Sequence, residues 1–182
     1  MIQRSRIFLT LLPALLLVGC SVPGISIYGD AEPGTPVGSG EQHSVHFFTR
    51  DPNFDTGLSF NQGNRYRMKI ALLSNWIDGN IEENEAGDEL DEAGFDNSLM
   101  PTEWMGQTRR SRSHNWFELM LYQPNCAGSS RMGISELEFD ENSNSYLFEA
   151  VCDGKLSLYV NDTHFFYINN AGYANIQFSR LN

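Results

Sequence analysis

Carboxylate and amide side chains gather in one short stretch, VNDTHFFYINNAG at residues 160–172. Asp162 comes first, and Asn169 and Asn170 follow seven and eight residues later. Oxygen atoms of this kind are the ligands that Ca²⁺ prefers, and Gly172 would let the backbone turn tightly behind them. The stretch therefore predicts a calcium loop. The alternative is a polar turn whose side chains only cap backbone N–H groups.

Alternating apolar residues predict that strands position this loop. Four runs each present one apolar face: Tyr66, Met68, Ile70 and Leu72; Phe117, Leu119 and Leu121; Leu156, Leu158 and Val160; Ala174, Ile176 and Phe178. SVHFF, ISELEF and YLFEAV are shorter candidates, and DENSN at 140–144 predicts a hairpin turn between the last two. No segment beyond the N-terminal apolar run has the pattern of an amphipathic helix. Many short strands predict an all-β protein, an antiparallel β-sandwich.

The N-terminal segment has the form of a bacterial export signal. Two arginines precede an apolar run over residues 7–18, which is too short for a comfortable membrane span. The ending Leu-Val-Gly-Cys20 resembles the lipobox of bacterial lipoproteins, which implies removal of residues 1–19 and lipidation of Cys20. Ser21 in place of Asp after the lipidated cysteine implies transport to the outer membrane. An ordinary signal peptide with an incidental cysteine is the alternative.

Composition separates a tether from a domain and excludes one class of partner. Residues 20–42 are rich in Gly, Pro and small polar residues and predict a flexible tether, leaving 43–182 as a single sandwich domain. The whole chain has a formal charge of −11, and loss of the two signal arginines makes this −13. Such a surface repels nucleic acid, so nucleic-acid binding is excluded.

Two cysteines remain after Cys20 is assigned to lipid. In an oxidising compartment Cys126 and Cys152 most simply form a disulfide, which would close a loop of about 26 residues and contribute on the order of 3 kcal/mol. A pair of metal-binding thiols is the alternative, although no CxxC spacing supports it.

The long segment at 75–113 has a biased composition. Nine acidic residues fall between Asp78 and Asp96, and they predict a solvated, flexible excursion. Three arginines follow, at positions 109, 110 and 112. The sequence contains no nucleophile elbow, HExxH or phosphate-binding glycine loop, and Ser113-His114 stands alone, so we expect a protein that is not an enzyme.

Two segments resemble the galactose-binding-like lectins, a family that includes the galactophilic calcium lectin of pseudomonads. LYVNDTHFFYINNAGYANIQF matches the family's Asn-Asp, Asn-Asn and Gly pattern around residues 161–172. FDTGLSFNQGNRYRMKIALLSNWIDG (54–79) resembles its TG turn and Trp-containing loop. The resemblance implies a jelly-roll sandwich of the galactose-binding-like type. The implied calcium ligands are Asp162, Asn169 and Asn170, the Phe166 carbonyl, and Asp78 or Gly79 from the Trp loop.

The same resemblance implies a function. Asp162, Asn169, His164 and Trp76 would contact a sugar whose hydroxyls complete the calcium shell. The family's His and Gln for the distal sugar hydroxyl have no counterpart in 80–113, which favours calcium over galactose. The predicted function is a lipid-anchored, calcium-dependent glycan-binding protein of the outer membrane. The alternative is a structural lipoprotein with structural calcium that binds a protein of the envelope.

Overall fold

The computed structural model describes residues 33–126 and 130–182. The predicted signal peptide, Cys20 and the first part of the predicted tether lie outside the described residues. Helical structure in the described ranges is limited to four short 3₁₀ turns: η1 (Asn97–Leu99), η2 (Glu103–Gln107), η3 (Ile134–Glu136) and η4 (Tyr167–Asn169). Within those ranges no helix has the length and apolar character needed to cross a bilayer.

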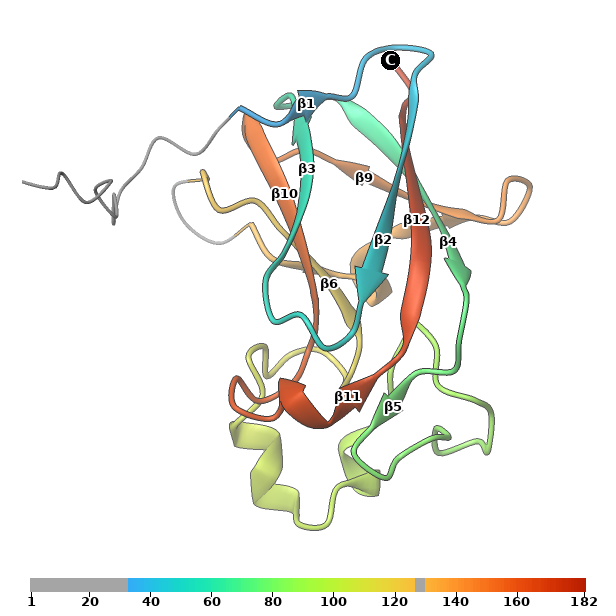
Figure 1. Cartoon of the computed structure of the whole chain (residues 1–182), viewed down its shortest axis with the longest axis vertical. Helices are drawn as coiled ribbons and strands as arrows, with labels where there is room; N and C mark the ends of the chain where they lie inside the picture. The colour runs from blue at the N-terminus through green and yellow to red at the C-terminus, as the bar shows by residue number, and fades with distance from the viewer. Residues whose placement is uncertain (1–32, 127–129) are drawn as a thin grey trace, which may run out of the picture. The chain divides into compact units, whose positions relative to one another are not determined.

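Two five-stranded sheets build the domain (Figure 1). The first sheet has the order β1 (Thr35–Pro36), β3 (Phe54–Phe60), β10 (Gly154–Val160), β6 (Leu119–Tyr122) and β7 (Met132–Gly133). The second has the order β2 (Gln42–Phe48), β12 (Tyr173–Arg180), β4 (Arg65–Leu72), β9 (Ser145–Glu149) and β8 (Glu138–Asp140). All pairs are antiparallel except β1 with β3. This confirms the all-β antiparallel fold class.

The core confirms most of the predicted alternation. The inward residues of β10 and β12 are completely buried: Leu156, Leu158 and Val160, and Ala174, Ile176 and Phe178. On β4, Tyr66 and Met68 are also buried, but Leu72 is 39% exposed. β9 pairs only with residues 65–68 of β4, so the second half of β4 is an edge with less cover.

Two predicted strands are shorter than the apolar patterns suggest. Phe117 is buried but has a φ of 61°, and its N–H donates to the Asn161 carbonyl instead of joining β6. The first half of ISELEF is the 3₁₀ turn η3, in which the Glu136 side chain accepts from the Gly133 N–H. At Phe117 a bond to a distant residue, and at Gly133 a local side-chain bond, stand outside the regular strand pattern, and the hydrophobic pattern does not report either.

The ordered unit begins before the predicted boundary at residue 43. Thr35 and Pro36 pair with Leu58 and Ser59 of β3, and Val37 is buried in the core. The predicted tether of 20–42 is therefore too long at its C-terminal end. Its Gly and Pro content fits an edge strand as well as a linker, because Pro is tolerated where no ladder N–H is needed.

The acidic run at 78–96 is not a solvated excursion. Leu90 and Phe95 are buried in the core, and Phe95 exchanges two backbone hydrogen bonds with Trp116. The carboxylates lie on turns between these anchors, where Asp91 and Asp96 accept from backbone N–H groups. Two apolar residues therefore hold the segment against the sandwich, although its composition is polar.

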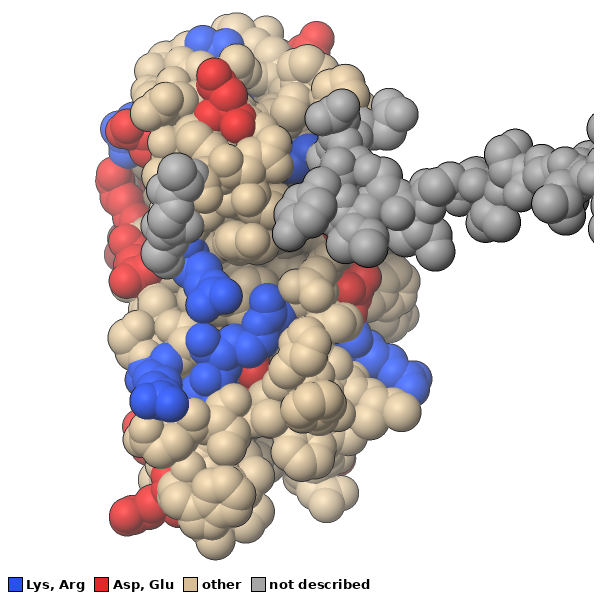
Figure 2. All heavy atoms as spheres, turned by 90° about the vertical axis from the view of Figure 1, so that its left-hand side faces the viewer, with Lys and Arg blue, Asp and Glu red and all other residues tan. Residues whose placement is uncertain are grey.

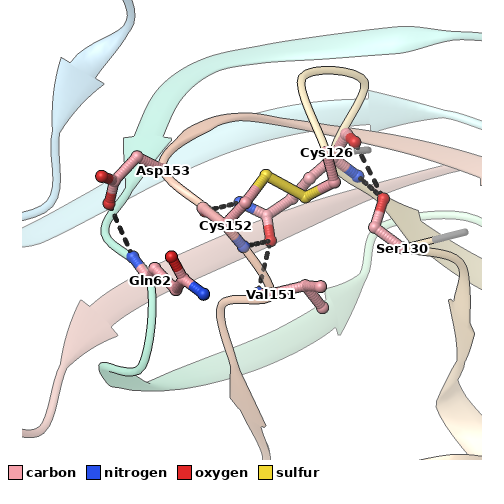
Figure 3. The surroundings of a disulfide bond; sticks show 7 residues. Gln62, Cys126, Ser130, Val151, Cys152 and Asp153 are labelled. Atoms are coloured by element: carbon pink, nitrogen blue, oxygen red, sulfur yellow. Dashed lines mark hydrogen bonds between the residues drawn. A yellow bond between two sulfur atoms is a disulfide. The ribbon is translucent and has the colours of Figure 1, made fainter. Parts of the chain in front are cut away.

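The disulfide between Cys126 and Cys152 is confirmed, with 5.6 Å between the two Cα atoms (Figure 3). It ties the chain that follows β6 to the turn that precedes β10. The buried Gln123 side chain supports the same turn, donating to the Cys152 carbonyl and accepting from the Val151 N–H. Gln62 adds a link from the β3–β4 turn through its N–H to Asp153.

Candidate metal and ligand site

A small two-stranded sheet brings the two predicted halves of the site together. β5 (Ile77–Asp78) follows the Trp-containing loop, and β11 (Asn170–Ala171) ends the predicted calcium loop. In this sheet Asn170 stands opposite Asp78. Figure 1 shows β5 and β11 together at one end of the sandwich, next to the segment that carries η1 and η2.

Four of the predicted site residues line one pocket of about 130 Å³: Asp78, Asp162, Phe166 and Asn169. The rest of its lining is Met100, Met105, Trp116 and Thr163. The pocket is small enough for an ion and a few ligand atoms, but it is not a deep cleft. Oxygen donors occupy one part of its wall and apolar side chains the other.

Asp162 and Asn170 form the buried part of the site. The Asn170 Nδ2 donates to Asp162 Oδ2 at 3.0 Å and to the Thr49 carbonyl at 3.4 Å. Its amide oxygen, Oδ1, is buried and has no hydrogen-bond partner among the described residues. A buried amide oxygen without a partner is unfavourable by about 1–3 kcal/mol, which a cation would relieve.

The two carboxylates of the site repel each other in a poorly solvated place. Burial, together with the neighbouring Asp162 charge, raises the pKa of Asp78 to about 7. Burial also raises the pKa of Asp162, although hydrogen bonds from Asn170 and the Thr163 N–H oppose this. Two buried carboxylates with raised pKa values indicate a site that gains from a positive charge.

Gly79 approaches the calcium loop closely. Its N–H donates to the Asn169 carbonyl at 3.3 Å, and a Cβ at this position would lie 2.9 Å from Asn169 Nδ2. Its φ of 60° also favours glycine. The contact keeps the Asn169 side chain beside the Trp loop, as a shared site requires.

The loop between Asp162 and Asn169 is a tight turn that one buried residue holds down. The Phe166 carbonyl points back into it and accepts from the Asn169 N–H at 2.9 Å. Tyr167 is buried, and its hydroxyl donates to the Val160 carbonyl. Phe165 and Ile168 point away from the core and are 85% and 72% exposed.

The structure does not bring the two remaining predicted contact residues to the pocket. Trp76 is fully buried, packs against Phe47 and Phe117, and lies under Gly172, where a Cβ would meet its ring at 2.7 Å. His164 is exposed and stacks edge-on against Phe165. Trp76 supports the loop from below, and His164 faces solvent beside it.

Sequence reasoning missed the residues that complete the pocket and brace it. Met100 and Met105 come from the long 75–113 segment, and no periodicity marks them. Trp116 begins the predicted strand that contains Phe117, and nothing in its sequence marked it as part of the pocket. Asn161 was noted only as part of a motif. Its amide group is buried, accepts from the Ser111 N–H at 2.8 Å and donates to the Asn115 carbonyl at 2.8 Å, so it fixes the arginine-containing loop beside Asp162.

The donor set fits calcium better than a transition metal. In the described part of the chain no three His, Cys, Asp or Glu side chains are grouped as metal ligands would be. The pocket instead combines two carboxylates with amide and backbone oxygens, and hard oxygen donors of this kind suit Ca²⁺.

Comparisons with known proteins found no matching family model and no matching curated protein. Among solved structures, the N-terminal domain of EclA, described as a PllA-like lectin, is 15% identical, with 76% of this chain and 95% of that chain covered and a TM-score of 0.47. PliG of Aeromonas hydrophila, a periplasmic inhibitor of g-type lysozyme, is 10% identical, with 82% and 96% covered and a TM-score of 0.33. At these values neither likeness carries an argument about function, and membership of the galactose-binding-like lectins stays a prediction.

Proposed function

We propose that this chain is a binding protein, not an enzyme, and that it holds a glycan through a calcium ion at the β5–β11 end of the sandwich. The ion would take the carboxylate of Asp162, the amide oxygens of Asn169 and Asn170, and the Phe166 carbonyl. Asp78 would add its carboxylate from the Trp loop, next to Gly79.

The buried Asn170 Oδ1 carries this proposal. It has no partner among the described residues, while the nitrogen of the same amide is held by Asp162 and Thr49. The Asn170 amide is therefore held in place by its nitrogen, while its oxygen lies without a partner in a site that already has two carboxylates of raised pKa. A capped polar turn explains the hydrogen bonds of the nitrogen but leaves the oxygen and the repulsion unexplained.

Bound calcium would supply a positive centre for two vicinal sugar hydroxyls. The residues of this chain would fix the direction of approach. Asp162 accepts hydrogen bonds from backbone and amide groups, so its orientation is set before any ligand arrives. The exposed ring of Phe166 borders the same pocket and offers an apolar surface to a sugar ring.

A structural calcium site that serves a protein partner is the second candidate, and one observation favours it. The loop beside the pocket exposes Phe165, Phe166 and Ile168, and η2 exposes Trp104. Large apolar side chains exposed together are typical of surfaces that bind other proteins. The same side chains restrict the space that a sugar would occupy.

We also propose that the chain is anchored to the outer membrane by lipid on Cys20. The Leu-Val-Gly-Cys sequence after the apolar run supports this. Metabolic labelling with palmitate should mark the protein and should be lost in Cys20→Ala. Unchanged labelling in that variant would refute the anchor but leave the proposed calcium site untouched.

Calcium should raise the melting temperature of the protein, and Asp162→Ala should abolish the rise. An ion that binds only the folded state stabilises it by about 2.7 kcal/mol at a concentration about 100 times Kd. Mg²⁺ should act much less, because it prefers a tighter shell and keeps its waters. Differential scanning fluorimetry with and without EDTA measures both effects. Exposed Asp88→Ala is the matched control and should keep the full calcium shift.

A glycan array then separates the two candidate functions. Binding that requires calcium and is lost in Asp162→Ala supports the glycan-binding function. A calcium shift without any glycan signal, together with capture of an envelope protein by crosslinking, supports the structural alternative. If calcium changes neither the melting curve nor the calorimetric trace, then Asp162, Asn169 and Asn170 form only a capped polar turn.

A further inference from the structure

Basic side chains gather on one face of this acidic protein. Figure 2 shows Lys and Arg in a band across the middle of the face that the first sheet presents. Arg109, Arg110 and Arg112 follow one another in the loop after η2, and Arg131 precedes β7. The whole chain has a formal charge of −11, so this concentration of positive charge runs against its composition.

The ion pairs found in the described residues leave these four arginines out. Arg65 and Arg67, on the second sheet, pair with Glu138 and Asp140. Lys155, on the first sheet, pairs with Asp55 at 3.1 Å. Within 33–126 and 130–182, no carboxylate lies at ion-pair distance from Arg109, Arg110, Arg112 or Arg131.

Arg110 is held in place by neutral groups. Its guanidinium donates to the Pro52 carbonyl, to Asn53 Oδ1 at 3.1 Å and to the Tyr167 hydroxyl at 3.1 Å. Its Cζ also lies 3.6 Å from the centre of the Tyr159 ring. These contacts fix the position of the charge without neutralising it, which is the arrangement that an anion-binding arginine needs.

Arg131 supplies a second charge beside the ring of Tyr122, on the neighbouring strand β6. It is exposed, with its Cζ 6.0 Å from the centre of the Tyr122 ring. Tyr122 on β6 stands opposite Ser157 of β10, two residues from Tyr159, so the two guanidinium groups lie over neighbouring tyrosines of adjacent strands. The Tyr159 hydroxyl is buried and has no hydrogen-bond partner among the described residues.

We propose that Arg110 and Arg131, with the ring of Tyr122, bind an acidic saccharide: a sugar that carries a carboxylate or phosphate group. The Tyr159 ring is fully buried and supports Arg110 from below. The acidic group would lie between the two guanidinium groups. Tyr122 is partly exposed on the outward face of β6 and would pack against the sugar ring. Guanidinium groups recognise planar or tetrahedral oxyanions through paired hydrogen bonds, and aromatic rings cover the apolar faces of sugars.

The charge balance favours a short ligand over a polyanionic surface. Screening limits the field of the arginines to about 8 Å at physiological ionic strength. A nucleic acid or an anionic membrane extends beyond that distance and meets the acidic remainder of the protein, which repels it. A saccharide with one to three acidic groups stays within the basic face.

This site extends the proposed glycan-binding function to a class of sugar but uses different residues. Its one backbone link to the calcium loop is the Arg110 N–H, which donates to the Asp162 carbonyl at 3.2 Å. Binding measured in EDTA therefore tests the basic face alone. Absence of saccharide binding in EDTA refutes this inference, whereas absence of a response to calcium refutes the proposed function.

Calorimetric titration of the full chain with trigalacturonate in EDTA tests the inference. We expect binding that weakens as NaCl rises, and none of the fully methyl-esterified sugar, which keeps the rings and loses the charges. Arg131→Gln should weaken binding about tenfold or more, since hydrogen bonds between charged groups are among the strongest in water. Arg110→Gln should do the same. Arg65→Gln, which removes an equal charge from the second sheet, should have no effect.

Arg131 keeps the test decisive if Arg110→Gln fails to fold, because its side chain is exposed. Equal binding of the charged and the esterified sugar would overturn the inference. So would unchanged affinity in Arg131→Gln. Inorganic phosphate that competes at the same concentration as trigalacturonate would show an adventitious ion site without a sugar subsite. Binding to vesicles of anionic lipid, with no binding of the sugar, would show that the basic face binds a membrane and would refute the inference.

Discussion

Asp78→Asn should stabilise the calcium-free protein at pH 8 and, at the same time, weaken its response to calcium. The carboxylate of Asp78 is buried at the pocket beside Asp162, and burial and the Asp162 charge raise its pKa to about 7. Above that pH, in the calcium-free protein, Asp78 carries its charge beside Asp162. The amide removes one charge and keeps the shape, so the repulsion disappears along with one calcium ligand.

The pH dependence follows from the direction of this shift. In the unfolded chain Asp78 loses its proton near the ordinary aspartate pKa of 3.8, whereas the folded protein holds the proton to about pH 7. Between these pH values the folded state binds more protons, so stability falls as pH rises. Above pH 7 the whole penalty is present, on the order of 4 kcal/mol. Asp78→Asn should flatten the profile between pH 4 and 7 and recover most of this amount at pH 8.

Chemical denaturation at several pH values, with EDTA and with calcium, measures both effects. Exposed Asp88→Asn is the control and should change stability by less than about 0.5 kcal/mol. The expected result is a variant that is more stable than the native protein in EDTA and gains less from calcium. A variant less stable in EDTA at pH 8 would show that the Asp78 charge is compensated within the protein.

Gly94→Ala should unfold the protein or lower its stability by about 4 kcal/mol or more, well beyond the usual effect of one methyl group. A Cβ at Gly94 would lie 2.0 Å from the Trp116 carbonyl oxygen and 2.5 Å from the Glu118 nitrogen. Both are backbone atoms, so neither can move away as a side chain would. The same backbone carries Trp116 into the wall of the pocket.

Gly87→Ala is the matched comparison, because it shares the left-handed backbone but not the contact. Gly87 has a φ of 84° and Gly94 a φ of 69°, yet a Cβ at Gly87 meets no atom within 4 Å. Gly87→Ala should therefore cost only about 1–2 kcal/mol of backbone strain. Urea denaturation of the two variants isolates the packing contribution as their difference. Similar losses in both would mean that the acidic segment detaches from the sandwich at little cost.

The strands and the loop that connects residues 162 and 169 could be predicted for the same reason. Leu156, Leu158 and Val160 repeat with the period of a strand, and the spacing from Asp162 to Asn169 fits a loop whose ends meet. Both patterns are local, so a single segment contains all the information. Asp78 was placed only through family resemblance, since its neighbour across β5 and β11 is distant in sequence.

The rest of the site depends on contacts between segments far apart in the chain. Leu90 and Phe95 are two apolar residues among many charges, and nothing local shows that they reach the core. Trp116 and Met105 meet Phe166 only after this segment has packed. The left-handed backbone at Phe117 was equally hidden, because an aromatic residue in an apolar run favours a strand.

The strand order of the two sheets has a consequence for synthesis of the chain. β10 lies between β3 and β6, and β12 lies between β2 and β4, so late segments occupy interior positions in both sheets. A ribosome-bound chain that ends before residue 154 has β2, β3 and β4 without the strands that join them. Neither layer can close until residues 154–180 have emerged. Compaction of such a nascent chain therefore waits for its last strands.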